Sequence, residues 1–129
     1  MVQSSTPEIA PDRQLIQGYG SGSFTVSGVR HRGSLLVFPD HVLSWSVATP
    51  AELDLASLAP VRDAVPRPEI LIVGSGAGFA LFPPDLRQAV REWGIVVEIM
   101  TTPAACRTYN VLLADERRVA AALIAMPAA

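Results

Sequence analysis

The stretch from Ile95 to Leu113, IVVEIM followed by TTPAACRTYNVLL, has the pattern of a buried strand, a short loop and a helix. The run IVVEIM is apolar apart from one glutamate and lacks the alternation of a half-exposed strand. This is typical of a parallel strand covered on both faces. Thr102 suits an N-cap and Pro103 the first helical position, so we predict a helix from Pro103 to about Ala114.

The segments on either side extend this pattern. Ile70–Val73 is another short apolar run, Pro83–Gly94 has a proline start and a glycine end, and Val119–Ile124 is a last apolar strand. The predicted helix between the first two strands has one apolar stripe, formed by Leu86, Val90 and Trp93. Strand–helix–strand–helix–strand order implies right-handed crossovers and a parallel sheet.

The first half of the chain has a different pattern. Between Leu15 and Val47, short β-prone runs separated by turn residues predict an antiparallel β-meander. In its last run, Val42–Val47, alternation predicts that Leu43, Trp45 and Val47 face the core. We expect Asp54 to cap a short helix that Pro60 ends.

The predicted fold is therefore α/β: an N-terminal antiparallel meander, then β-α-β-α-β with a parallel sheet, in a three-layer arrangement. Residues 1–14 are polar and read as a loose tail, and residues 15–126 form one domain.

Composition limits the function classes. The net charge is −2, the ten basic residues form no run, and half of the residues are apolar, which predicts an ordered globular domain that does not bind nucleic acid. We find no secretory signal, no apolar run long enough to span a membrane and only one cysteine, which favours a soluble, cytoplasmic protein. No metal-ligand spacing is present, and we expect neither metal nor cofactor.

The glycine-rich loop after Val73, Gly74-Ser75-Gly76, invites comparison with a dinucleotide-binding loop. In that motif the glycines lead directly into a helix, whereas here the segment Phe79–Pro83 intervenes. We interpret the glycines as a tight turn at the end of a strand, at the sheet edge where α/β proteins usually place ligands.

Cys106, Arg107 and Asn110 are predicted to share one face of the last helix, and Ala105 and Tyr109 the packed face. If the thiol is accessible, the helix N-terminus and Arg107 would both favour a thiolate on Cys106. The competing interpretation is that a lone cysteine packs as a small hydrophobe. No histidine has an evident link to Cys106, so no catalytic residues are predicted.

Glu98 is the one charge in IVVEIM. A carboxylate in a buried strand needs a partner, and Arg107 is the one we expect. A lone paired acid is more often structural than catalytic. The candidate binding surface therefore consists of Gly74, Ser75, Gly76, Glu98, Thr101, Thr102, Cys106, Arg107, Tyr109 and Asn110.

Four segments together resemble a known family: Gly33–Trp45, Pro68–Gly76, Gly94–Glu98 and Thr101–Asn110, the last containing CRTYN. The chain is similar to small α/β proteins related to mitochondrial respiratory complex I assembly factor 3 and to their bacterial relatives of unknown function. The resemblance implies a compact three-layer β/α fold. For the mitochondrial branch it implies a non-enzymatic role in building complex I with a second assembly factor.

Because no mitochondrial targeting segment is evident, the chain resembles a bacterial-type member. We expect a binding or assembly module with a protein partner rather than an enzyme. The alternative is a small-molecule or anion binder, with a thiol enzyme as one form, that uses Cys106, Arg107 and Asn110. A purely structural role for the same cluster also stays open, and the sequence leaves the oligomeric state undecided.

Overall fold

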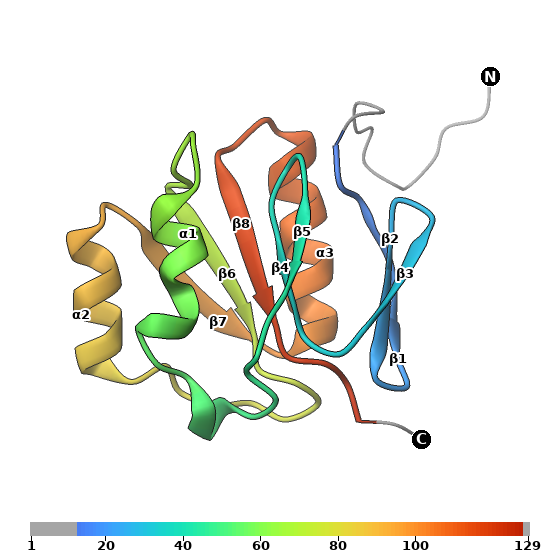
Figure 1. Ribbon diagram of the computed structural model, residues 1–129, viewed down its shortest axis with the longest axis horizontal. Coiled ribbons are helices and arrows are strands. Elements are labelled where there is room, and N and C mark those ends of the chain that lie inside the picture. Colours follow the sequence, from blue (N-terminus) through green and yellow to red (C-terminus); the bar gives the residue numbers. More distant parts are fainter. Residues whose placement is uncertain (1–12, 128–129) are drawn as a thin grey trace.

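The computed structural model describes residues 13–127, so nearly all of the predicted tail at residues 1–14 lies outside the described residues. Strands and helices follow the predicted order along the chain (Figure 1). They are β1 (Ile16–Gly20), β2 (Ser23–Val26), β3 (Val29–Arg32), β4 (Leu35–Val37), β5 (Val42–Ser44), the 3-10 turns η1 (Pro50–Glu52) and η2 (Ala56–Leu58), α1 (Ala59–Asp63), β6 (Ile70–Gly74), α2 (Pro84–Glu92), β7 (Val96–Met100), α3 (Thr102–Ala114) and β8 (Val119–Leu123).

Two sheets are present. The first has the order β1-β2-β3 and is antiparallel, and the second has the order β5-β4-β8-β6-β7. β6 pairs in parallel with both β7 and β8, which confirms the predicted parallel unit. β4 pairs antiparallel with β5 and with β8, so the larger sheet is mixed.

The five-stranded sheet is the middle of three layers. Helices α1 and α2 cover one face, and α3 with the three-stranded sheet covers the other (Figure 1). Alternate residues of β6 divide between the two cores: Leu71 and Val73 pack toward α1 and α2, and Ile72 packs toward α3. This confirms a three-layer α/β fold.

The predicted meander is divided between the two sheets. Its first part forms β1, β2 and β3, while β4 and β5 join the larger sheet beside β8. We did not predict β3 as a separate strand, because Val29–Arg32 contains only one apolar residue. A tight turn at Ser27 and Gly28, both with positive φ, returns the chain onto β2 and creates this strand.

Two local predictions were wrong. Trp45 and Val47 are buried as expected, but Leu43 is exposed because β5 ends at Ser44 and lies at the edge of the sheet. Asp54 does accept a hydrogen bond from the Ser57 N–H, at 2.8 Å. Pro60, however, lies in the first turn of α1 instead of ending a helix, a position where the missing N–H costs nothing.

Candidate functional site

The carboxyl end of β6 is joined to the start of α3 by a close backbone contact. A Cβ atom on Gly74 would lie 2.7 Å from Thr102 Oγ1 and 2.9 Å from Thr102 Cα, so only glycine fits there. The Thr102 hydroxyl accepts a hydrogen bond from the Gly76 N–H (2.8 Å) and donates one to Ile124 O (2.7 Å). This buried side chain therefore connects the glycine loop, α3 and the end of β8.

The helix start is less open to an anion than the sequence suggested. The N-cap of α3 is Thr101 and not Thr102, and its side chain makes no capping hydrogen bond. The Thr102 N–H donates to Gly76 O at 2.9 Å, and Pro103 has no N–H. Two of the first backbone positions of the helix are thus unavailable to a ligand.

Cys106 is buried, with 2% of its surface exposed. Burial raises the pKa of its thiol to about 12, and the nearby Arg107 charge only partly opposes this shift. The condition for an activated thiolate, an accessible thiol, is therefore not met. The physical reason is that α3 packs against the large sheet on one side and β1 on another, which widens its buried face.

The other predicted helix residues also separate. Arg107 is exposed, and Tyr109 is fully buried with a pKa raised chiefly by burial. The Tyr109 hydroxyl bonds no described residue. Asn110 Oδ1 accepts the Ile16 N–H (3.0 Å) and Asn110 Nδ2 donates to Ile16 O (2.7 Å). Asn110 thus joins α3 to β1, so the structure does not group Cys106, Arg107 and Asn110 around a ligand site.

Glu98 needs no buried partner, because β7 is the edge strand of the large sheet and this residue is exposed. The ion pairs of residues 13–127 do not include one between Glu98 and Arg107. The prediction of a buried pair was wrong because a run of apolar residues does not distinguish an edge strand from a central one. A charge on an edge strand discourages unwanted strand pairing.

At the carboxyl end of β6, the exposed segment is the loop that follows Gly76. Ser75 is buried, and its hydroxyl donates to Gly78 O at 2.6 Å, which holds the turn closed. Beyond it, Phe79 is 71% exposed and Leu81 is 79% exposed, while Phe82 is buried in the core. We did not predict this pair as functional. The available signal was the apolar segment between the glycines and the helix.

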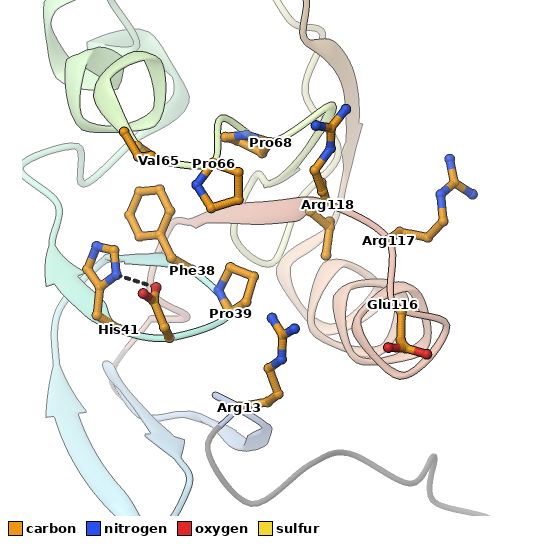
Figure 2. A pocket seen from close by; sticks show the side chains of 13 residues that line it. Arg13, Phe38, Pro39, His41, Val65, Pro66, Pro68, Glu116, Arg117 and Arg118 are labelled. Atoms are coloured by element: carbon orange, nitrogen blue, oxygen red, sulfur yellow. Dashed lines mark hydrogen bonds and ion pairs between the residues drawn. The ribbon is translucent and has the colours of Figure 1, made fainter.

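A cavity of about 330 Å³ lies at the opposite end of the strands, near the starts of β6 and β8. Figure 2 shows its apolar wall, which includes Phe38, Pro39 and Pro66. The Phe38 and His41 rings stack with centroids 4.5 Å apart. Asp40 Oδ1 lies 2.7 Å from His41 Nδ1, and this hydrogen bond is the main reason that the pKa of Asp40 is lowered.

The charges at this cavity largely compensate one another. Arg117 Nε and Arg118 Nη2 contact the Glu69 carboxylate at 3.3 Å and 3.5 Å. In Figure 2 the Arg13 side chain extends toward the cavity, whereas Arg117 points away from it. The arginines therefore do not converge on one point, and the cavity has the size but not the polar convergence of a ligand site.

No group of three or more His, Cys, Asp or Glu side chains within residues 13–127 is arranged to hold a metal ion. None of the helices in this part of the chain is long and apolar enough to cross a membrane.

Known proteins similar to this chain in sequence or structure include bacterial proteins and a complex I assembly factor. An uncharacterised protein of Rhodobacter capsulatus is 40% identical over 114 residues, covering 88% of this chain and 86% of that protein. NADH dehydrogenase (ubiquinone) 1 alpha subcomplex assembly factor 3 of Xenopus tropicalis is 36% identical over 110 residues, covering 85% of this chain. The NMR structure of a Rhodopseudomonas palustris protein is 43% identical and superposes with a TM-score of 0.79, covering 98% of this chain and 94% of that one.

The fold and these matches define a mixed α/β protein with two sheets. The family model described as "Protein of unknown function (DUF498/DUF598)" matches residues 16–124, and the chain belongs to this family. The resemblance to complex I assembly factor 3 and its bacterial relatives is thereby confirmed. The aligned region spans only 60% of the length of the Xenopus assembly factor.

Proposed function

We propose that this chain is a non-enzymatic protein-binding module of the assembly-factor kind, and that the loop at residues 77–81 is its main contact. The observation that carries the proposal is the exposure of Phe79 and Leu81 on one short loop. Large apolar side chains on an exposed loop held by a rigid scaffold are typical of interaction sites. Burying such a pair against a partner would contribute roughly 3–5 kcal/mol before the costs of association.

The scaffold beneath this loop supports such a role. The Ser75 hydroxyl donates to Gly78 O and the Gly76 N–H donates to the Thr102 hydroxyl, and these bonds hold the turn that leads into residues 79–81. Ordering the start of the loop on binding would then cost little, which favours affinity. Because the Thr102 N–H bonds Gly76 O, Thr101 lies at the same edge of the sheet. We include Thr101 and the exposed Arg107 in the proposed surface as its polar rim.

The kind of partner is suggested by the relatives. The Xenopus relative is named for assembly of NADH dehydrogenase, a role that requires binding to other proteins. Since this chain matches only part of that protein, we propose the general role, binding a protein during assembly of a larger complex, and leave the partner to experiment.

The alternative, a small-molecule or anion binder or a thiol enzyme at Cys106, has no specific observation in its favour. It would require movement of α3, since Cys106 is buried and both polar groups of the Asn110 side chain bond Ile16. We therefore propose no catalytic residue.

The test uses site-specific photocrosslinking in the source cell. Benzoylphenylalanine at position 79 should capture a defined partner, and the same group at position 111 should not, although Val111 is also exposed. The double variant Phe79→Ser/Leu81→Ser should lose capture at a third site, position 101. The matched control Val65→Ser/Val111→Ser removes two other exposed apolar side chains and should retain it.

Thermal melting of all variants should remain within a few degrees, because none of these side chains packs in the core. Equal capture at positions 79 and 111, or unchanged capture by the Phe79→Ser/Leu81→Ser protein, would contradict the proposal.

A further inference from the structure

Charge is unevenly distributed along this acidic chain. Residues 13–39 contain Arg13, Arg30 and Arg32 and no aspartate or glutamate, although the whole chain has a net charge of −2. This segment supplies β1, β2, β3 and β4, and the three-stranded sheet stands at one end of the molecule (Figure 1). The small sheet is therefore a basic region on an otherwise acidic protein, and it favours acidic partners.

One edge of that sheet is available for pairing. β3 is the outer strand of the order β1-β2-β3, with the register Val26↔Val29 next to the turn and Thr25↔Arg30 after it. In a hairpin with a two-residue turn, the pair flanking the turn is hydrogen-bonded and the next pair is not. The backbone N–H and C=O of Arg30 and Arg32 therefore point away from β2. No other described residue hydrogen-bonds them.

The side chains of β3 alternate between two surfaces. Arg30 and Arg32 are exposed on the outer face, where the Arg30 Nε donates to the Ser23 hydroxyl at 3.2 Å. Val29 and His31 face the other way and line a groove of about 280 Å³ that also contacts Val42 of β5. Val29 is 57% exposed there. One face of this edge is thus basic, and the other offers an apolar contact.

We propose that β3 binds an extended acidic segment of a protein partner, which adds to the small sheet as a further strand. In the partner strand, the two residues directly opposite Arg30 and Arg32 lie on the same face as these arginines and are acidic. The partner residue between these two acidic residues points into the groove beside Val29 and is apolar or small. Main-chain hydrogen bonds provide affinity in this mode of recognition, and the alternating side chains provide specificity.

A second copy of this chain does not fit the same edge, because pairing β3 with β3 brings like charges together and disfavours the pair. Arginines on an edge strand thus both discourage self-association and select an acidic strand. This surface lies on β3 and does not depend on the loop at residues 77–81, so either proposal can fail alone.

The test titrates three synthetic peptides separately into the ¹⁵N-labelled protein and follows the backbone amide signals by NMR. The first, acetyl-(Thr-Glu)4-amide, is acidic and able to form a strand. The second, acetyl-(Thr-N-methylGlu)4-amide, has the same charge but lacks the backbone N–H groups of the residues that lie opposite Arg30 and Arg32. The third, acetyl-(Thr-Lys)4-amide, is basic. We expect only the first to bind, with shifts centred on β3 and slowed amide exchange at Arg30 and Arg32.

The double variant Arg30→Gln/Arg32→Gln should bind the first peptide about tenfold more weakly. The control Arg62→Gln/Arg91→Gln removes two arginines elsewhere and should bind it as the wild type does. Equal binding of both acidic peptides would show charge attraction without strand addition and would overturn the proposal. So would the absence of binding at millimolar peptide, or binding that the Arg30→Gln/Arg32→Gln protein retains.

Discussion

Replacing Thr102 with valine tests whether its buried hydroxyl stabilises the contact between the glycine loop, α3 and the end of β8. Valine keeps the shape of threonine and removes only the hydroxyl, which accepts from the Gly76 N–H and donates to Ile124 O. Both hydrogen bonds are buried, so both partner groups would lose their only bond to this side chain without reaching water. We expect Thr102→Val to destabilise the protein with little change in its fold.

The size of the effect follows from the two buried groups that lose their partner, the Gly76 N–H and Ile124 O. A buried donor or acceptor without a partner costs about 1–3 kcal/mol, so the variant, which leaves one of each, should lose about 2–6 kcal/mol of the free energy of unfolding. Domains of this size have roughly 5–15 kcal/mol in total. At roughly 4 °C per kcal/mol, the melting temperature should fall by about 8–24 °C.

Urea unfolding followed by circular dichroism measures this loss directly. The matched control is Thr102→Ser, which keeps the hydroxyl and removes one methyl group. This variant should lose only about 1 kcal/mol of the free energy of unfolding. If Thr102→Val were as stable as the wild type, or less affected than Thr102→Ser, the hydroxyl would not join the three segments as described.

Four further outcomes are expected. Cys106 should resist thiol reagents at pH 8 until the protein unfolds, because its pKa of about 12 lies far above its ordinary value. Since the folded pKa is the raised one, this thiol should leave stability unchanged below about pH 9 and reduce it between about pH 9 and 12, a decline that Cys106→Ala should lessen in urea titrations. Gly74→Ala should cost about 1–3 kcal/mol by differential scanning calorimetry, because the new methyl meets the backbone of Thr102. Asn110→Ala should cost a similar amount and, by hydrogen exchange, loosen β1 more than β6, because it removes both bonds to Ile16.

The second half of the chain was predictable because its signals are local. A proline begins α2, Gly94 ends it with a positive φ of 84°, and the apolar runs on either side form β6 and β7. Each element is specified by residues within or beside it. The order and type of these elements therefore followed from the sequence.

The candidate site was less predictable because burial depends on what surrounds an element. Cys106 lies next to Ala105 on the helix, and both are buried since α3 is covered by two sheets. The helical spacing alone does not indicate a second covering surface. The pairing of β4 with β8, which brings Leu35 beside Leu123, likewise joins distant segments that no local pattern relates.

The exposed residues that carry both proposals were missed for a related reason. Phe79 and Leu81 sit in a loop where the sequence shows only apolar character, and Arg30 and Arg32 belong to a strand created by the turn before it. Exposure and edge position are properties of the assembled structure.

Completion of the five-stranded sheet depends on β8, the strand at its centre. Among residues 13–127, β8 stands between β4 and β6, so it links the β4–β5 hairpin to the parallel β6–β7 pair within the five-stranded sheet. Before Val119–Leu123 pairs, a folding chain can form only two partial sheets, β5-β4 and β6-β7, each with an unpaired strand beside the gap. Until β8 docks, these edges are open to aggregation, so the folding chain depends on fast docking of β8 or on a chaperone.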